Sequence, residues 1–224
     1  MPAHRTGLVI FDCDGVLVDS ERINVRTWGR MTADLGLSMT REEIIDTFVG
    51  KAYADNRVRL ADLHGQPLDP EWERRFRAEF RAGHDELELV PGARAALEGC
   101  LAAGLEVCVA SGSLRAALEY KLEGSGLADL LPPRLRFSSE EVAHGKPSPD
   151  VFLHAAEAMG YEVSRCVVVE DSRAGVEAGH AAEMPVIAYE SDMTPHAWFA
   201  DADVIITDMA EVPAEAVRLL TPSP

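Results

Sequence analysis

The amino-acid sequence predicts an α/β fold in which a parallel sheet has helices on both faces, with an all-α segment inserted after the first strand. Two observations lead to this prediction. Short, continuous apolar runs alternate with helical patterns over most of the chain, which is typical of strands covered on both faces of a parallel sheet. One long segment, 20–88, breaks the alternation because it contains helical patterns without a strand pattern.

The predicted strands are short runs rich in β-branched and other apolar residues. They cover 8–11, 105–110, 166–169, 185–189 and 204–206. We expect the last of them to lie near an edge of the sheet. Helical patterns lie between and after these runs, over 93–103, 114–124, 149–160, 173–182 and 213–220.

The inserted segment is predicted to form a helical unit of its own. Its helical patterns cover 20–35, 41–48, 52–63 and 70–83. Thr40 followed by Glu43 has the spacing of a capping box at the start of the second helix. The expected organisation is a core domain formed by residues 1–19 and 89–224, and a helical domain formed by residues 20–88.

The charge balance restricts the classes of partner. With 21 basic and 38 acidic residues among 224, the net charge is −17. Such a surface repels nucleic acid and anionic lipid, whereas a few local cations or a metal ion can still attract a small phosphorylated ligand. The four cysteines show no C-x-x-C spacing, which favours free thiols in a reducing compartment. We therefore expect a cytoplasmic protein without a nucleic-acid or membrane partner.

An acidic pair, Asp12 and Asp14, follows the first predicted strand and is itself followed by Gly15. Residues two apart in extended chain point to the same side, and ligands bind at the carboxyl ends of parallel strands. Two close carboxylates repel each other unless a cation lies between them, and oxygen ligands suit a divalent cation. Read alone, the pair is equally compatible with a turn that caps a helix.

A second acidic pair, Glu170 and Asp171, follows the predicted strand 166–169, with Ser172 positioned to cap the next helix. Alone, it is an acidic helix start, which the helix dipole favours. Because the carboxyl ends of parallel strands lie at one edge of the sheet, the two pairs together indicate a magnesium site.

Two further patterns suggest anion binding. Ser111 and Gly112 stand between a predicted strand and a helix, where hydroxyl and N–H groups can hold an anion, although a plain helix cap is the alternative. Lys146 lies between Gly145 and Pro147, and the proline restricts the backbone around it. The lysine could neutralise a phosphate, or it could be an ordinary surface lysine before a helix.

In order along the chain, these patterns resemble the haloacid-dehalogenase-like (HAD) hydrolase superfamily, in the branch with a small helical cap after the first strand. The motifs FDCDGVLVDSE, GKPSPDVF and VVVEDSRAG underlie the resemblance, which covers about residues 7–190. The branch includes phosphoglycolate phosphatases, sugar-phosphate phosphatases and β-phosphoglucomutases. The resemblance implies a Rossmannoid three-layer α/β/α core with a helical-bundle cap.

The resemblance also implies a role for each matched position. Asp12 would be the nucleophile that takes the phosphoryl group, and Asp14 would protonate the leaving oxygen and then activate water. Ser111 and Gly112 would bind the phosphoryl oxygens, and Lys146 would neutralise the charge between them and the nucleophile.

The same resemblance implies Mg²⁺ as the cofactor. The metal residues would be Asp12, Asp14 through its backbone carbonyl, and Asp171, with Glu170 either binding the ion or orienting the site. The implied activity is a Mg²⁺-dependent phosphatase that acts on a small phosphate monoester, a sugar phosphate or sugar-acid phosphate, through an aspartyl-phosphate on Asp12.

Two alternatives remain open. In β-phosphoglucomutases the cap supplies a histidine and an arginine, whereas by position this chain has Asn24 and, near the arginine, Tyr53, with Lys51 as a neighbouring cation. We expect these three cap residues to contact the substrate in either case. A non-catalytic protein that binds a phosphorylated ligand is the other alternative, although every catalytic position holds a competent residue. The expected partner is a small phosphorylated metabolite, and the expected assembly is a monomer or weak dimer.

Overall fold

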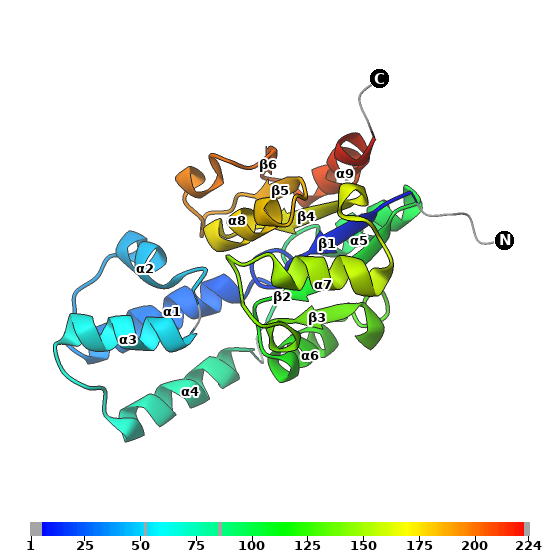
Figure 1. The fold of residues 1–224 in the computed structure, drawn as a ribbon. Coiled ribbons are helices and arrows are strands. Elements are labelled where there is room, and N and C mark those ends of the chain that lie inside the picture. The colour runs from blue at the N-terminus through cyan, green and yellow to red at the C-terminus, as the bar shows by residue number, and fades with distance from the viewer. Residues whose placement is uncertain (1–5, 52, 85–86, 222–224) are drawn as a thin grey trace.

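A computed structural model describes residues 6–51, 53–84 and 87–221 of the chain. In this part the core is a six-stranded parallel sheet with the strand order β3-β2-β1-β4-β5-β6 (Figure 1). The strands are β1 (Leu8–Phe11), β2 (Glu106–Ser111), β3 (Arg136–Ser138), β4 (Cys166–Glu170), β5 (Val186–Tyr189) and β6 (Val204–Ile206). The predicted parallel sheet is confirmed, and β6 lies at an edge as expected.

Helices cover both faces of the sheet because the central strand is apolar on both sides. In β1, Val9 and Phe11 face one hydrophobic cluster, while Leu8 and Ile10 face the other. The first cluster includes residues of α5 (Ala93–Ala102), α6 (Arg115–Gly124) and α9 (Val212–Leu220). The second includes residues of α7 (Asp150–Met159) and α8 (Arg173–Ala181). The continuous apolar runs in the sequence therefore correspond to strands buried on both faces.

The sequence prediction missed one strand, β3. Its first residue, Arg136, is charged yet only 1% exposed. A strand of three residues that begins with a charged side chain resembles a loop in a hydropathy pattern. Arg136 is stabilised by the carbonyl of Leu131 at 2.7 Å and by the carboxylates of Glu119 and Glu123. Every other predicted strand and helix has ends within one residue of the structure. Short 3-10 helices fill some connections: η1 (Pro133–Leu135), η2 (Ser139–Glu141), η3 (Val163–Arg165), η4 (His196–Phe199) and η5 (Met209–Glu211).

The inserted segment forms four helices that lie together beside one end of the sheet (Figure 1). They are α1 (Ser20–Asp34), α2 (Arg41–Phe48), α3 (Tyr53–His64) and α4 (Pro70–His84). The predicted capping box is present, since the Thr40 hydroxyl accepts the Glu43 N–H and the Glu43 carboxylate accepts the Thr40 N–H. Inside this unit the rings of Trp28 and Phe48 stack at 4.6 Å between centroids.

The helical unit meets the core in two places. At the linkers, Val18 bridges to Leu89, and the N–H of Asp19 donates to the carbonyl of Glu88 at 2.9 Å, so the two chain passages run side by side. In the loop after β5, Asp192 pairs with Arg22 and Arg41. Met193, from the same loop, is buried in the hydrophobic cluster of the helices, with Trp198 packed against that cluster. The domain limits at 19/20 and 88/89 remain a prediction.

Candidate active site

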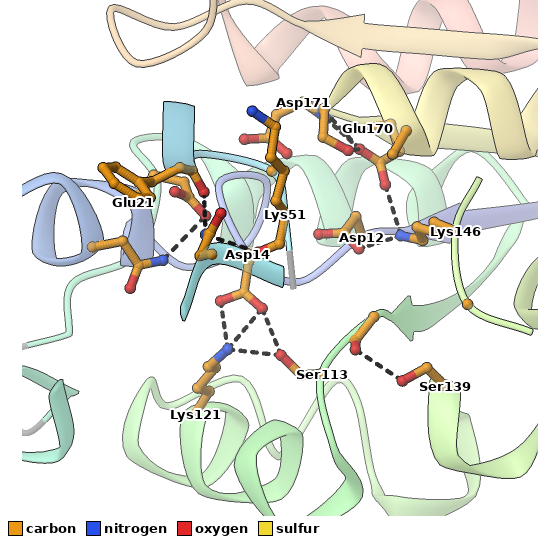
Figure 2. A pocket seen from close by; sticks show the side chains of 18 of the residues that line it. Asp12, Asp14, Glu21, Lys51, Ser113, Lys121, Ser139, Lys146, Glu170 and Asp171 are labelled. Carbon is orange, nitrogen blue, oxygen red and sulfur yellow. Dashed lines mark hydrogen bonds and ion pairs between the residues drawn. The ribbon is translucent and has the colours of Figure 1, made fainter. Parts of the chain in front are cut away.

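A cleft of about 490 Å³ lies between the carboxyl ends of the strands and the helical unit. The turn after β1 and the ends of β2 and β4 line one wall, and α1, α3 and α4 with the segment after α2 line the other. Figure 2 shows acidic and basic side chains from both walls converging on this space. The acidic pairs that the sequence singled out meet here, as parallel strands predict.

Asp12, directly after β1, forms the centre of the first group of side chains. Lys146 Nζ donates to Asp12 at 2.5 Å and to Glu170 at 2.6 Å, and all three side chains are at most 9% exposed. Burial raises the pKa of Asp12 to about 7, with Glu170 and Asp14 adding to the rise and Lys146 opposing it. Burial alone would lower the pKa of Lys146, but the two carboxylates raise it, so this lysine stays charged.

Glu170 has both carboxylate oxygens engaged. One accepts from Lys146, and the other accepts the N–H groups of Asp171 and Ser172, each at 2.9 Å, and the Ser172 hydroxyl. Ser172 in turn accepts the N–H of Gly175, which confirms it as the cap of α8. These contacts make Glu170 an orienting group that joins Lys146 to the start of α8.

Asp14 lies in a second group, which includes a lysine that the sequence analysis did not select. Lys121, on α6, donates to the two oxygens of Asp14 at 2.5 and 2.7 Å, and Ser113 donates to the same carboxylate (Figure 2). The hydroxyl of Ser20 is a further donor to Asp14. Burial alone would raise the pKa of Asp14, but Lys121 and the two hydroxyls lower it to about 2.

Two signals in the sequence point to Lys121. It is one of only three lysines in the chain. Lys121 also lies three residues after Leu118, so the two side chains share the buried face of α6.

The acid cluster around Asp171 fits a divalent cation. Asp171 is 4% exposed, and burial raises its pKa, as do the nearby carboxyls of Glu170, Glu21, Asp12 and Asp14. Its carboxylate lies against Gly15, where an added Cβ would come within 1.8 Å of Oδ2. Carboxylates crowded in this way need a compensating cation.

The donor set for such a cation is small. No three His, Cys, Asp or Glu side chains in the described part of the chain are arranged to hold an ion by themselves. A cation at this position would therefore need an oxygen other than these side chains, from the backbone or from the substrate.

Serine hydroxyls from the ends of β2 and β3 hold the turn after β2 in place. Ser111 is 1% exposed, and its hydroxyl accepts the N–H of Ser113 at 3.0 Å, while Gly112 and Ser113 line the cleft. The hydroxyls of Ser138 and Ser139, at the end of β3 and just after it, donate to the carbonyls of Ser113 and Gly112, each at 2.8 Å. The strand that the sequence analysis missed therefore supports the turn where we expect the phosphate to bind.

On the helical side, two of the three expected cap residues line the cleft. Asn24 donates to Glu21 at 3.2 Å, and Lys51 donates to the carbonyls of Asp46 and Thr47 at the end of α2. Tyr53 begins α3, but its side chain lies outside the described part of the structure. Glu21 and Asn56 also line the cleft, and the sequence analysis selected neither of them.

Comparison with known proteins identifies the family. A family model described as haloacid dehalogenase-like hydrolase matches residues 6–183. The chain belongs to this family. The resemblance inferred from the motifs is therefore confirmed, and the protein is an enzyme of the hydrolase class. In the described part of this HAD-like hydrolase, no helix is long and apolar enough to cross a membrane.

Relatives of this HAD-like hydrolase cover nearly the whole chain. The 6-phosphogluconate phosphatase of Escherichia coli (strain K12) is 34% identical over 194 residues, which are 86% of this chain and 85% of that protein. Hexitol phosphatase A of the same organism is 32% identical over 207 residues and 91% of each chain. A HAD family hydrolase from Deinococcus radiodurans R1, solved with bound phosphate and sodium, has a TM-score of 0.80 at 32% identity and covers 97% of this chain and 98% of its own.

Proposed function

We propose that this HAD-like hydrolase is a Mg²⁺-dependent phosphatase that hydrolyses a sugar phosphate or sugar-acid phosphate through an aspartyl-phosphate on Asp12. The observation that carries the proposal is the position of Asp12 beside the Lys146 ammonium, with the Asp14 carboxylate in the same cleft. The names of the relatives, a 6-phosphogluconate phosphatase and a hexitol phosphatase, support this class of substrate.

Each residue has a role in a two-step reaction. An oxygen of Asp12 attacks phosphorus, the ester P–O bond breaks, and the leaving oxygen takes a proton from Asp14. Water then attacks phosphorus, Asp14 takes a proton from that water, and the bond to Asp12 breaks to release phosphate. Lys146 neutralises charge on the phosphoryl oxygens, which is a major requirement of phosphoryl transfer.

The residues that would hold Mg²⁺ are Asp12, Asp171 and the backbone carbonyl of Asp14, with Glu170 orienting Lys146. When bound, the ion would offset the negative charge between the nucleophile and the phosphate. Gly112 and Ser113, on the turn after β2, line the cleft where the phosphoryl oxygens would bind.

The test is phosphate release from a panel of phosphate esters, with and without Mg²⁺. The panel contains sugar phosphates, sugar-acid phosphates, phosphoglycolate and nucleoside monophosphates. We expect Mg²⁺-dependent release that Asp12→Asn abolishes, while circular dichroism shows an intact fold. Asp62→Asn, the same change at an exposed position, is the matched control. Turnover by Asp12→Asn at the wild-type rate would remove this mechanism.

The same panel tests the two other readings. A β-phosphoglucomutase from Mycobacterium bovis is 29% identical over 242 residues, so β-glucose 1-phosphate is included and its conversion to glucose 6-phosphate is measured separately. Interconversion without net phosphate release would show a mutase. A folded protein with neither activity in the presence of Mg²⁺ would favour a non-catalytic ligand-binding role.

A further inference from the structure

Two residues that line the cleft each have a buried side-chain oxygen without a hydrogen-bond partner within the protein. In the described part of the chain, the buried side-chain polar atoms without a partner are Glu21 Oε2, Asn56 Oδ1 and one nitrogen of Arg136. The first two belong to residues that line the cleft, and these residues are 8% and 2% exposed. A buried polar group left unmatched costs about 1–3 kcal/mol, so a ligand group that reaches these oxygens gains by satisfying them.

The rest of each side chain is fixed in place. Glu21, on α1, accepts from Asn24 through its other oxygen. Asn56, on α3, donates its amide N–H to the carbonyl of Phe48 at 2.7 Å. The two free oxygens are therefore held in position from two different helices of the cap, which is the preorganisation that a binding site needs.

The surroundings suit a polyhydroxylated carbon chain. A hydroxyl group can both donate and accept a hydrogen bond, so it matches a carboxyl oxygen in either protonation state, and it can donate to an amide oxygen. The aromatic residues Trp28, Phe48 and Phe80 line the same cleft and offer apolar surface to C–H groups. A chain that carries several hydroxyls can reach both oxygens at once.

The charges of the cleft disfavour a second anionic group on the substrate. The carboxyl groups that line it belong to Asp12, Asp14, Glu21, Glu170 and Asp171. Among the described lining residues the cations are lysines. Lys146 and Lys121 pair with carboxylates, whereas Lys51 donates to two backbone carbonyls and keeps its charge. A substrate carboxylate placed beside Glu21 and Asn56 would bring only acceptor oxygens to the amide oxygen of Asn56 and would be repelled by the carboxyl groups of the cleft.

We propose that Glu21 and Asn56 bind substrate hydroxyls and make this enzyme selective for phosphate esters of a neutral polyhydroxylated chain over those of a sugar acid. This inference rests on the proposed phosphatase function and narrows its substrate class. The selectivity comes from an amide oxygen that only a donor group can satisfy and from a carboxyl group beside which a second carboxylate is unfavourable.

The experiment compares kcat/KM for a hexitol 6-phosphate, 6-phosphogluconate and p-nitrophenyl phosphate. The first two share a six-carbon chain and differ in having a neutral or an anionic far end, while the third has no hydroxyl on its leaving group. We expect the wild type to prefer the hexitol phosphate to 6-phosphogluconate at least tenfold. In Glu21→Gln, this ratio should fall at least fivefold, because the carboxyl group that disfavours the sugar acid is replaced by a neutral amide.

Two measurements distinguish substrate binding by Glu21 from a role of Glu21 at the metal site. Glu42→Gln makes the same change at an exposed position of α2 and should leave every ratio unchanged. If Glu21 instead served the metal site, Glu21→Gln would lower all three activities alike and raise the Mg²⁺ concentration needed for half-maximal rate. That result would overturn the inference.

One further outcome would overturn the inference, and another would refute the proposed function. A wild-type preference for 6-phosphogluconate that Lys51→Met abolishes would overturn the inference, because Lys51 would then bind the sugar acid. Absence of Mg²⁺-dependent p-nitrophenyl phosphate hydrolysis, and of any other phosphatase activity, would instead refute the proposed function itself.

Discussion

The ammonium of Lys121 lies 2.5 and 2.7 Å from the two carboxylate oxygens of Asp14. This contact joins helix α6 to the turn after β1. Because it holds the pKa of Asp14 at about 2, Asp14 is ionised in the free enzyme at neutral pH. That form accepts a proton from water in the second step of the proposed reaction, whereas for the first step Asp14 has to take up a proton when the substrate binds.

Replacing Lys121 tests this relationship. In Lys121→Met the burial of Asp14 is no longer compensated, so its pKa rises and its protonated form persists to higher pH. We expect kcat to fall at least tenfold at pH 5.5, with phosphorylated enzyme accumulating and with a smaller deficit at pH 8. Acid-quenched turnovers and a kcat–pH profile measure both effects. Lys121→Arg keeps the charge and should recover part of the rate; an unchanged profile in Lys121→Met would refute the role.

Gly15 is the second test, because the Asp171 carboxylate occupies the space that a side chain at this position would need. It has a φ of +77°, and an added Cβ would lie 1.8 Å from Asp171 Oδ2. We expect Gly15→Ala to lose activity at least a hundredfold and to lose stabilisation by Mg²⁺ in thermal unfolding.

Gly36 provides a matched control for Gly15. It has a similar φ of +76° and nothing within 4 Å of an added Cβ. Gly36→Ala therefore carries the backbone strain, of order 1–2 kcal/mol, without the clash. Equal loss of activity in both variants would show that strain, and not displacement of Asp171, is the cause.

Stabilisation by Mg²⁺ should depend on pH. Burial raises the pKa of Asp12 from 3.8 to about 7 and also raises that of Asp171. Between about pH 4 and 7 the folded metal-free protein therefore binds more protons than the unfolded chain, and its stability falls as the pH rises. Mg²⁺ needs the ionised carboxylates. The rise in Tm on adding Mg²⁺ should thus be small at pH 5 and larger at pH 8.

Thermal unfolding with Mg²⁺ and with EDTA measures this difference. Asp171→Asn should remove most of the stabilisation by Mg²⁺ at both pH values, because it removes one of the two carboxylates that would bind the ion. A larger effect of Mg²⁺ at pH 5 than at pH 8 would contradict the assignment of the site.

Arg136 should stabilise β3. In Arg136→Met the carbonyl of Leu131 loses a donor, Glu123 loses its ion pair with Arg136, and Glu119 keeps only its ion pair with Arg115. We expect the free energy of unfolding to fall by about 2 kcal/mol. Breaking a fully buried ion pair would lower it further, but these two carboxylates are partly exposed. Urea unfolding measures the change. Arg134→Met, an exposed arginine two residues earlier, should cost less than about 0.5 kcal/mol.

The sequence was sufficient to predict the apolar strands, the helices and the convergence of the two acidic pairs. Each of these depends on local periodicity or on where parallel strands end. Arg136 was misread because its charge is compensated by residues on a preceding helix and loop, which a local pattern does not reveal. The partner of Lys121 is 107 residues away along the chain. The unmatched oxygens of Glu21 and Asn56 can be recognised only once every neighbouring donor has been placed.

The burial of Met193 among the cap helices has a consequence for exchanging the helical segment between members of this family. Residues 20–88 are contiguous in sequence, but their hydrophobic cluster is completed by a side chain from the loop after β5. Transplanting that segment alone onto a related core would leave an apolar gap and two arginines without Asp192. A chimaera that moves substrate preference from one relative to another would therefore have to transfer the loop together with the helices.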